Sequence, residues 1–222
     1  MPEPIIRVLV VDDQELFASG LAMLIEAQSD MVCVGTAVDG RKALEAVEQL
    51  HPDIVLMDLR MPEMNGIDAT RAVLAKGEAD DPPKVIVLTT LKRDEVVAQA
   101  LTAGASAFLT KDATPEQVLG TVRSVHAGNA IPDLRETLGL IAETSGLSVS
   151  PRRQEALDVL SPREREVFLL VARGLTNAEI AEAAYVSEAT VKSHTRAILQ
   201  KLALRSRVQV VVFAYENGLV SA

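Results

Sequence analysis

The sequence predicts a doubly wound α/β domain with a five-stranded parallel sheet, followed by a small all-α domain. Over the first 127 residues, five short apolar runs alternate with amphipathic stretches. Strands that alternate with helices form a parallel sheet covered on both faces. From residue 161 onward the chain shows only helical patterns, beginning with a helix-capping sequence, Ser161-Pro-Arg-Glu164. The two parts therefore belong to different fold classes.

The strands of the first part are expected at its apolar runs. The run Val85-Ile-Val-Leu88 is apolar on both faces, as in a covered parallel strand. After the last strand, Thr114 can cap a helix, Pro115 suits its first position and Gln117 can close a capping box. The expected strands are residues 5–11, 31–37, 54–58, 84–89 and 107–110, and the expected helices between them are residues 15–27, 41–50, 67–75 and 95–103.

The second part reads as a bundle of short, well-capped helices. A helix is expected from Ser161 to about Arg173, where Gly174 ends it. A second capping box, Thr176-Asn-Ala-Glu179, opens a short helix that ends in a turn at residues 185–186. Ser187 caps a longer helix to about residue 202, and a last helix covers residues 206–215. Two helices joined by a tight turn within a small bundle match a helix-turn-helix.

Periodicity is weak between the two parts. Residues 128–150 contain Gly, Pro, Ser and Thr, with one weak helical patch near residues 134–142 and a short helix expected at about residues 152–160. We therefore assign residues 1–128 to the first domain, 129–157 to a linker and 158–222 to the second domain.

The composition of the chain limits the classes of function that it can have. The chain has 222 residues, nearly half of them apolar, which is enough for a sizeable core. Cys33 is the only cysteine, which excludes an internal disulfide and a Cys-rich zinc site, and its apolar neighbours favour a buried structural thiol. No signal segment or membrane-length apolar run is seen, so a cytoplasmic protein is expected. The net charge of −9 divides into +2 for residues 161–222 and −11 for the rest, which suggests different partners for the two parts.

Polar residues follow several of the expected strands. Asp12 and Asp13 follow the first strand, Asp58 ends the third, and Thr89 and Lys111 follow the fourth and fifth. Parallel α/β sheets place their sites at the carboxyl ends of the strands, so these residues are expected to meet. Clustered carboxylates repel one another unless a cation lies among them, and oxygen ligands suit Mg²⁺. A nearby lysine and hydroxyl would complete a place for a phosphoryl group.

The segments that carry these residues resemble the receiver domain of two-component response regulators. They are Val-Leu-Val-Val-Asp12-Asp13, Leu-Met-Asp58-Leu-Arg-Met-Pro-Glu-Met-Asn-Gly66, Val-Leu-Thr89 and Phe108-Leu-Thr-Lys111-Asp. The resemblance covers residues 5–128 and implies the flavodoxin-like receiver fold. Asp112 follows Lys111 where many receivers have Pro, a residue that the NarL/FixJ branch often lacks.

The receiver resemblance implies a role for each site residue. It makes Asp58 the nucleophile that accepts a phosphoryl group. It assigns Mg²⁺ to Asp13, to Asp12 directly or through water, to Asp58, and to the backbone carbonyl of Arg60. Lys111 and the Thr89 hydroxyl would each bind a phosphoryl oxygen. Phe108 is either an aromatic that moves inward with Thr89 or a plain core residue.

The second part resembles the LuxR-type output domain of the same NarL/FixJ regulators. The matching segments are Gly174-Leu-Thr-Asn-Ala-Glu179-Ile-Ala181, Val186-Ser187, Thr190-Val191-Lys192-Ser-His194 and Ile198-Leu-Gln-Lys201-Leu202. Two residues depart from the pattern: Ala184 replaces a bulky aliphatic, and Ala203 stands where Gly or Asn often follows the long helix.

The long helix of this second part has one apolar and one polar face. Val191, Ile198 and Leu202 share the face that packs on the bundle, with His194 and Thr195 beside it, so His194 is read as structural or phosphate-contacting. A solvated charged face is the ordinary reading of the polar side, but the preceding capped helix and turn favour contact with DNA. Thr176 and Asn177 begin a helix, where a DNA phosphate can bind. The expected DNA contacts are Thr176, Asn177, Thr190, Lys192, Ser193, Arg196 and Lys201.

These observations predict a transcription regulator of a two-component system. A sensor histidine kinase would phosphorylate Asp58, and the chain would then bind DNA as a homodimer, with Val208, Val211 and Val212 extending the contact between copies. It would not be an enzyme beyond catalysing its own modification. One alternative is a phosphatase or phosphotransferase with an aspartyl phosphate, although Arg60 stands where dehalogenase-type enzymes need a second acid. Another is a receiver that works without phosphate. Incubation with acetyl phosphate and Mg²⁺ distinguishes the three possibilities. A regulator keeps a stable label, a phosphatase or phosphotransferase turns the donor over rapidly, and a receiver that works without phosphate takes up no label.

Overall fold

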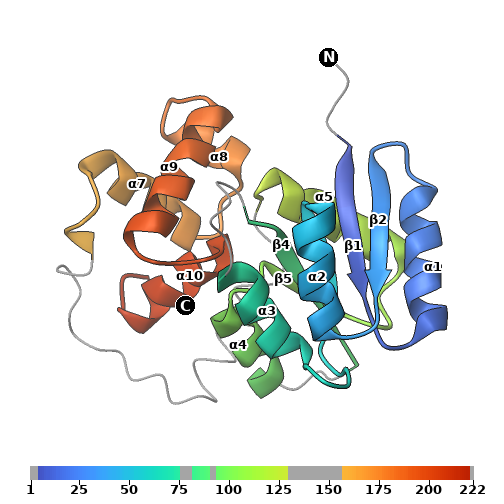
Figure 1. Cartoon of the computed structure of the whole chain (residues 1–222). Helices are drawn as coiled ribbons and strands as arrows, with labels where there is room; N and C mark the ends of the chain where they lie inside the picture. Colours follow the sequence, from blue (N-terminus) through green and yellow to red (C-terminus); the bar gives the residue numbers. More distant parts are fainter. Residues whose placement is uncertain (1–4, 76–81, 91–93, 130–156, 221–222) are drawn as a thin grey trace. The chain divides into compact units, whose positions relative to one another are not determined.

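The computed structural model describes residues 5–75, 82–90, 94–129 and 157–220. The chain divides into two compact units, with the division between His126 and Ala127 (Figure 1). Most of the expected linker lies outside the described residues, with the weak helical patch near residues 134–142 and the first part of the short helix expected at about residues 152–160. The domain boundaries therefore stay a prediction. Among the described helices, none is long and apolar enough to cross a membrane.

The first unit is built on a five-stranded parallel sheet, with strand order β2-β1-β3-β4-β5. The predicted strands are confirmed, and only the start of the first moves by one residue. The strands are β1 (Ile6–Val11), β2 (Met31–Ala37), β3 (Ile54–Asp58), β4 (Lys84–Thr89) and β5 (Ala107–Thr110). The helices are α1 (Glu15–Glu26), α2 (Gly40–Leu50), α3 (Gly66–Ala75), α4 (Asp94–Ala103) and α5 (Pro115–Ala127).

Strand order fixes which helices share a face of this sheet. The chain steps from β1 to β2 in one direction and then returns past β1 to β3, β4 and β5. Right-handed crossovers in opposite directions place α1 on one face and α2, α3 and α4 on the other (Figure 1). Arg123 of α5 forms an ion pair of 2.7 Å with Asp30, which follows α1, so α5 shares the face of α1. Both faces of the inner strands are therefore covered.

The core of the first unit is aliphatic at the inner strands. Residues 8–11 of β1 and 54–57 of β3 are fully buried, as their unbroken apolar sequences predict. β2 is an edge strand, and Cys33 on it is only half-buried. The expectation of a buried thiol is therefore wrong in degree, because an edge strand has a neighbour on one side only. Burial still raises the pKa of the Cys33 thiol.

In its described residues, the second unit has four helices around one core. They are α7 (Pro162–Ala172), α8 (Asn177–Ala183), α9 (Glu188–Lys201) and α10 (Arg207–Glu216). Phe168 and Phe213 meet edge to face, with ring centroids 6.0 Å apart. Ile180, Val191 and Ile198 are fully buried in the same core. Both predicted capping boxes form, at Ser161 with Glu164 and at Thr176 with Glu179, so these two glutamates are caps, as expected.

Candidate functional site

Three carboxylates meet at the carboxyl edge of the sheet. β1 ends immediately before Asp12 and Asp13, and Asp58 is the last residue of β3, the strand that pairs with β1. One carboxylate oxygen from each of the three lies within 4.8 Å of the others. Asp12 and Asp58 are 0% and 3% exposed, whereas Asp13 is exposed. The sheet therefore assembles the acidic cluster that the strand ends predicted.

Lys111 places one positive charge between the two buried carboxylates. Its Nζ lies 2.7 Å from Asp12 Oδ2 and 3.1 Å from Asp58 Oδ2. The Lys111 backbone N–H donates to the Thr89 carbonyl at 2.8 Å, which fixes the start of the lysine side chain beside the end of β4. The ammonium also lies 4.9 Å from the centroid of the Phe17 ring on α1, a cation–π contact. Phe17 was not singled out from the sequence, because its spacing on α1 is that of an ordinary half-buried helix residue.

The negative charge of Asp58 is only partly compensated by its surroundings. Burial raises the pKa of Asp58, and the hydrogen bond and charge of Lys111 oppose this only in part. Burial alone would lower the pKa of Lys111, but its hydrogen bonds to Asp12 and Asp58 outweigh that effect and raise it. The Arg60 backbone also hydrogen-bonds to Asp58. A further positive charge at Asp58 would therefore be stabilising.

The donor set fits a hard divalent cation. Three carboxylate oxygens within 4.8 Å of one another can reach a single ion, and oxygen ligands are those that Mg²⁺ takes. Asp13 is the exposed member and leaves an open side toward solvent. Magnesium keeps several waters and is bound by one or two carboxylates together with phosphate oxygens, which this open side allows.

The backbone around Asp58 approaches too closely for side chains at two glycines. A Cβ on Gly66 would lie 2.0 Å from the carbonyl oxygen of Asp58, and the Gly66 N–H donates to the Leu59 carbonyl at 3.1 Å. A Cβ on Gly40 would lie 2.8 Å from the carbonyl oxygen of Met64. Close backbone contacts therefore fix the loop between β3 and α3 at two points, Gly66 against Asp58 and Met64 against Gly40. Such contacts are expected for a segment that shapes the site.

Thr89 and Phe108 lie at neighbouring strand ends. Thr89 is 4% exposed at the end of β4, while its neighbour Thr90 is exposed, which favours Thr89 as the site hydroxyl. Phe108, paired with Val87 in the sheet, is partly buried against the core. This position fits both readings of Phe108, so its role in switching stays a prediction.

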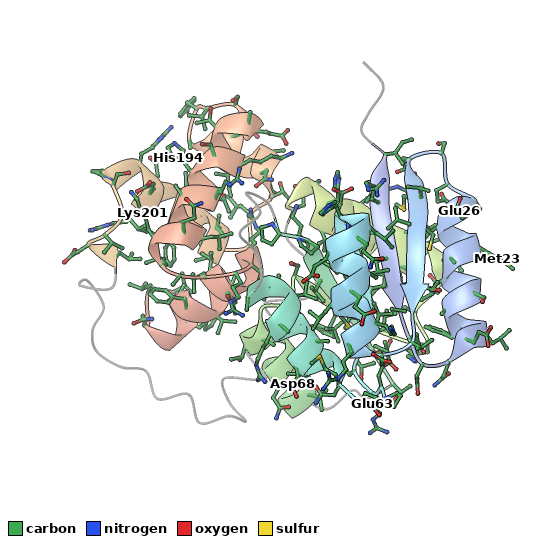
Figure 2. All side chains as sticks on the ribbon, in the orientation of Figure 1. Met23, Glu26, Glu63, Asp68, His194 and Lys201 are labelled. Carbon is green, nitrogen blue, oxygen red and sulfur yellow. The ribbon has the colours of Figure 1, made fainter. Side chains whose placement is uncertain are left out.

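In the second unit, α8, the turn after it and α9 form the predicted helix-turn-helix. The Ser187 side chain caps α9 by accepting from the Thr190 N–H. Val191 and Ile198 are buried. Apart from Lys201, the exposed residues of α9 form one stripe: Glu188, Ala189, Lys192, Ser193, Arg196 and Gln200. The stripe contains Lys192, Ser193 and Arg196 of the expected DNA contacts. His194, labelled in Figure 2, is half-buried.

Four of the expected DNA contacts already have hydrogen-bond partners within the second unit. Lys201, labelled in Figure 2, has its Nζ 2.7 Å and 2.9 Å from the two carboxylate oxygens of Glu164. Asn177 Oδ1 accepts from Arg207 Nη1 at 2.9 Å, and the Asn177 side chain is buried. The Thr190 hydroxyl lies 2.9 Å from the Ser187 hydroxyl. The Thr176 hydroxyl donates to the exposed carboxylate of Glu179 at 2.9 Å.

The three valines expected to pair two copies lie on α10. Val208 and Val211 are 3% and 2% exposed, and Val212 is half-buried. The core of the second unit takes Val210 and Ala214 from this helix rather than these three. A contact between copies through Val208 and Val211 therefore requires both side chains to become accessible.

Comparison with known proteins agrees with both halves of this geometry. Residues 8–123 match the response regulator receiver domain, and residues 158–214 match the LuxR family of bacterial regulatory proteins. The chain is 38% identical over 215 residues to the uncharacterized transcriptional regulatory protein YxjL of Bacillus subtilis, covering 97% of each chain. It is 34% identical over 218 residues to the response regulator protein VraR of Staphylococcus aureus, covering 97% of this chain and 99% of VraR.

A solved structure supports the fold of the first unit. The receiver domain of the putative response regulator NarL from Mycobacterium tuberculosis aligns with 57% of this chain and 99% of its own, at 33% identity and a TM-score of 0.54. A five-stranded receiver sheet with an acidic site, joined to a helix-turn-helix, defines a response regulator that acts on transcription. The chain belongs to the response regulator receiver family, in the group whose output domain is the LuxR-type DNA-binding domain.

Proposed function

We propose that a phosphoryl group on Asp58 controls DNA binding by α9. The observation that carries this proposal is the position of Lys111, whose Nζ lies 3.1 Å from Asp58 and 2.7 Å from Asp12. A buried acid with one cation beside it and an open side toward solvent is arranged to take up an anionic group. The burial of Asp58 and Thr89 keeps competing water away from the product.

The transfer follows from the residues around Asp58. A carboxylate oxygen of Asp58 forms a bond to phosphorus, while the bond from phosphorus to the donor's leaving atom breaks and that atom keeps the electron pair. Lys111 turns from the carboxylates to a phosphoryl oxygen, and the Thr89 hydroxyl donates to another. Asp12, Asp13, Asp58 and the Arg60 carbonyl would hold Mg²⁺, which when bound neutralises charge on the transferred group.

The proposed partners follow from the phosphoryl transfer and from the exposed stripe of α9. A sensor histidine kinase would supply the phosphoryl group, and double-stranded DNA would bind the exposed stripe of α9, chiefly through Lys192, Ser193 and Arg196. Phosphorylation would favour a homodimer, and the protein would act in the cytoplasm, where bacterial DNA lies. The chain would catalyse only its own modification.

Labelling by a small phosphodonor tests the assignment of Asp58. With acetyl phosphate and Mg²⁺ the full chain should acquire a stable acyl phosphate, measured by mass spectrometry. Asp58→Asn should abolish the label because the nucleophile is lost. Asp13→Ala should also prevent labelling, but by weakening metal binding, which is measured separately by titration with Mg²⁺. Labelling of Asp58→Asn at the rate of the unmodified chain would refute the assignment, and rapid turnover of acetyl phosphate would indicate a phosphatase.

A further inference from the structure

The turn between α8 and α9 holds a bulky side chain in a backbone conformation that bulky side chains rarely adopt. Tyr185 has a φ of 55°, in the left-handed region, and its side chain is 95% exposed. In this region the Cβ of an L-residue crowds its own carbonyl oxygen, so Gly or Asn is the usual choice. A single exposed aromatic needs no explanation by itself. An exposed aromatic at a strained position has no packing contact to offset the strain.

The hydrogen bonds of the turn show that the backbone requires the left-handed conformation. The Tyr185 N–H donates to the Glu182 carbonyl at 3.2 Å, and the Val186 N–H donates to the Ala181 carbonyl at 3.0 Å. These two bonds form a Schellman motif, which ends a helix through one left-handed residue. The guanidinium of Arg163 also donates to the Ala184 carbonyl. The turn is held by backbone groups, none of which needs a phenol.

Other helices of the same unit provide an internal comparison. α7 and α10 end in the same pair of hydrogen bonds, and there the left-handed residues are Gly174 and Gly218, with φ of 82° and 60°. α9 ends likewise at Ala203, with φ of 53° and only a methyl group. Within the described part of this unit, Tyr185 is the bulky exception. Residues that break a local rule are expected to be retained for function.

We propose that the Tyr185 hydroxyl donates a hydrogen bond to a phosphate oxygen of bound DNA. Tyr185 stands two residues before Ser187, the N-cap of α9, and recognition helices enter the major groove with their N-terminal residues at the base edges. Ser187, Glu188 and Ala189 are exposed, so Tyr185 continues the open surface of this end of α9. Tyrosine hydroxyls are among the groups that contact phosphates and set the register of a protein on the duplex. The proposal rests on DNA binding through α9.

Removal of the hydroxyl alone is the direct test. The full-length chain, treated with beryllofluoride as a phosphoryl mimic, is titrated against a labelled DNA duplex of mixed sequence. Tyr185→Phe should weaken binding about tenfold, the usual effect of losing a hydrogen bond to a charged group. The loss should be the same on other sequences, because a phosphate contact carries no base information. The slope of affinity against salt should not change, because no positive charge is removed. Binding equal to that of the unmodified chain would overturn the proposal.

Two glycine variants distinguish the proposed phosphate contact of Tyr185 from the effect of left-handed backbone strain. Tyr185→Gly and Ala203→Gly each relieve a left-handed residue, so both should raise the thermal unfolding temperature, measured by circular dichroism. Only Tyr185→Gly should also weaken DNA binding. An equal loss of DNA binding in Ala203→Gly would overturn the proposal, because helix-end rigidity would then explain both results. Arg196→Ala in the same assay tests the wider function: if it too leaves affinity and salt slope unchanged, α9 is not the DNA surface.

Discussion

At the scale of single residues, Gly66 lies too close to neighbouring backbone atoms to accept a side chain without a shift. A Cβ there would lie 2.0 Å from the carbonyl oxygen of Asp58 and 2.9 Å from Leu59 Cα, both backbone atoms that cannot rotate away. Gly66→Ala must therefore move either the start of α3 or the end of β3. We expect it to lower the free energy of unfolding by about 3 kcal/mol, at the upper end for overpacking, and to slow labelling of Asp58. Chemical denaturation and acetyl phosphate labelling measure the two effects.

Gly20 provides the matched control for this substitution. It lies in the interior of α1, and a Cβ there would meet no atom within 4 Å. Gly20→Ala should therefore stabilise the chain, by about 0.5–1 kcal/mol, because alanine loses less conformational freedom than glycine in a helix. If the two alanine variants had the same stability, the close approach at Gly66 would not limit this fold.

The residues of the acidic site could be predicted because their positions follow from topology alone. Asp12, Asp13, Asp58 and Lys111 each stand at a strand end, and parallel strands bring their carboxyl ends to one edge. The contact of Phe17 with Lys111 could not be predicted in this way. It depends on how α1 is rotated against the sheet, which the periodicity of one helix does not specify to within a side chain.

At the scale of elements, the start of α7 is joined to the end of α9. Glu164 serves two partners: it closes the capping box with the Ser161 N–H at 2.7 Å and binds Lys201 at 2.7 Å and 2.9 Å. These bonds lower the pKa of Glu164 from 4.5 to about 2, chiefly through Lys201. A carboxylate with a lowered pKa stabilises the fold above its ordinary pKa, and the contribution is lost as the pH falls from 4.5 toward 2.

The Glu164–Lys201 ion pair leads to a prediction that distinguishes two roles of Lys201, holding α7 to α9 and contacting a DNA phosphate. The first is measured by stability against pH, and the second by the salt dependence of DNA binding. Glu164→Gln and Lys201→Gln should both lower the unfolding temperature at neutral pH. The difference for Glu164→Gln should disappear as the pH falls toward 2, where the unmodified Glu164 is protonated. Because Lys201 is held by Glu164, Lys201→Gln should leave the salt slope of DNA binding unchanged. A slope reduced by about 1 would show that Lys201 contacts a phosphate, as its place in the sequence motif suggested.

Helix ends were the most predictable elements of the second unit. Ser161, Thr176 and Ser187 cap their helices as the sequence indicated, because a capping side chain acts within three residues of itself. The ends at Tyr185 and Ala203 were less predictable. Their backbone is left-handed without the glycine that normally marks it, so composition alone did not disclose the strain.

At the scale of the whole molecule, the two fold classes and their order could be predicted from the change in hydrophobic period near residue 127. The pairing of copies is harder to predict, because a hydrophobic face on a short helix serves a core and an interface equally well. The three valines of α10 show this difficulty: we expect them to extend a contact between copies, whereas the chain buries Val208 and Val211. If they contact a second copy, their side chains must become exposed in a change of state, which sequence periodicity does not encode.

The last prediction concerns that change of state. Residues 161–222 carry a net charge of only +2, so one copy should hold DNA weakly, and two linked copies gain affinity because the second binds at a high effective concentration. Phosphate on Asp58 should draw in Thr89 and Phe108 and reshape the surface of α4, β5 and α5, which favours the pair. Beryllofluoride with Mg²⁺ should therefore raise the sedimenting mass and tighten DNA binding in the unmodified chain, while Asp58→Asn should not respond. If the mimic binds Asp58 and changes neither quantity, the phosphoryl group is not the switch.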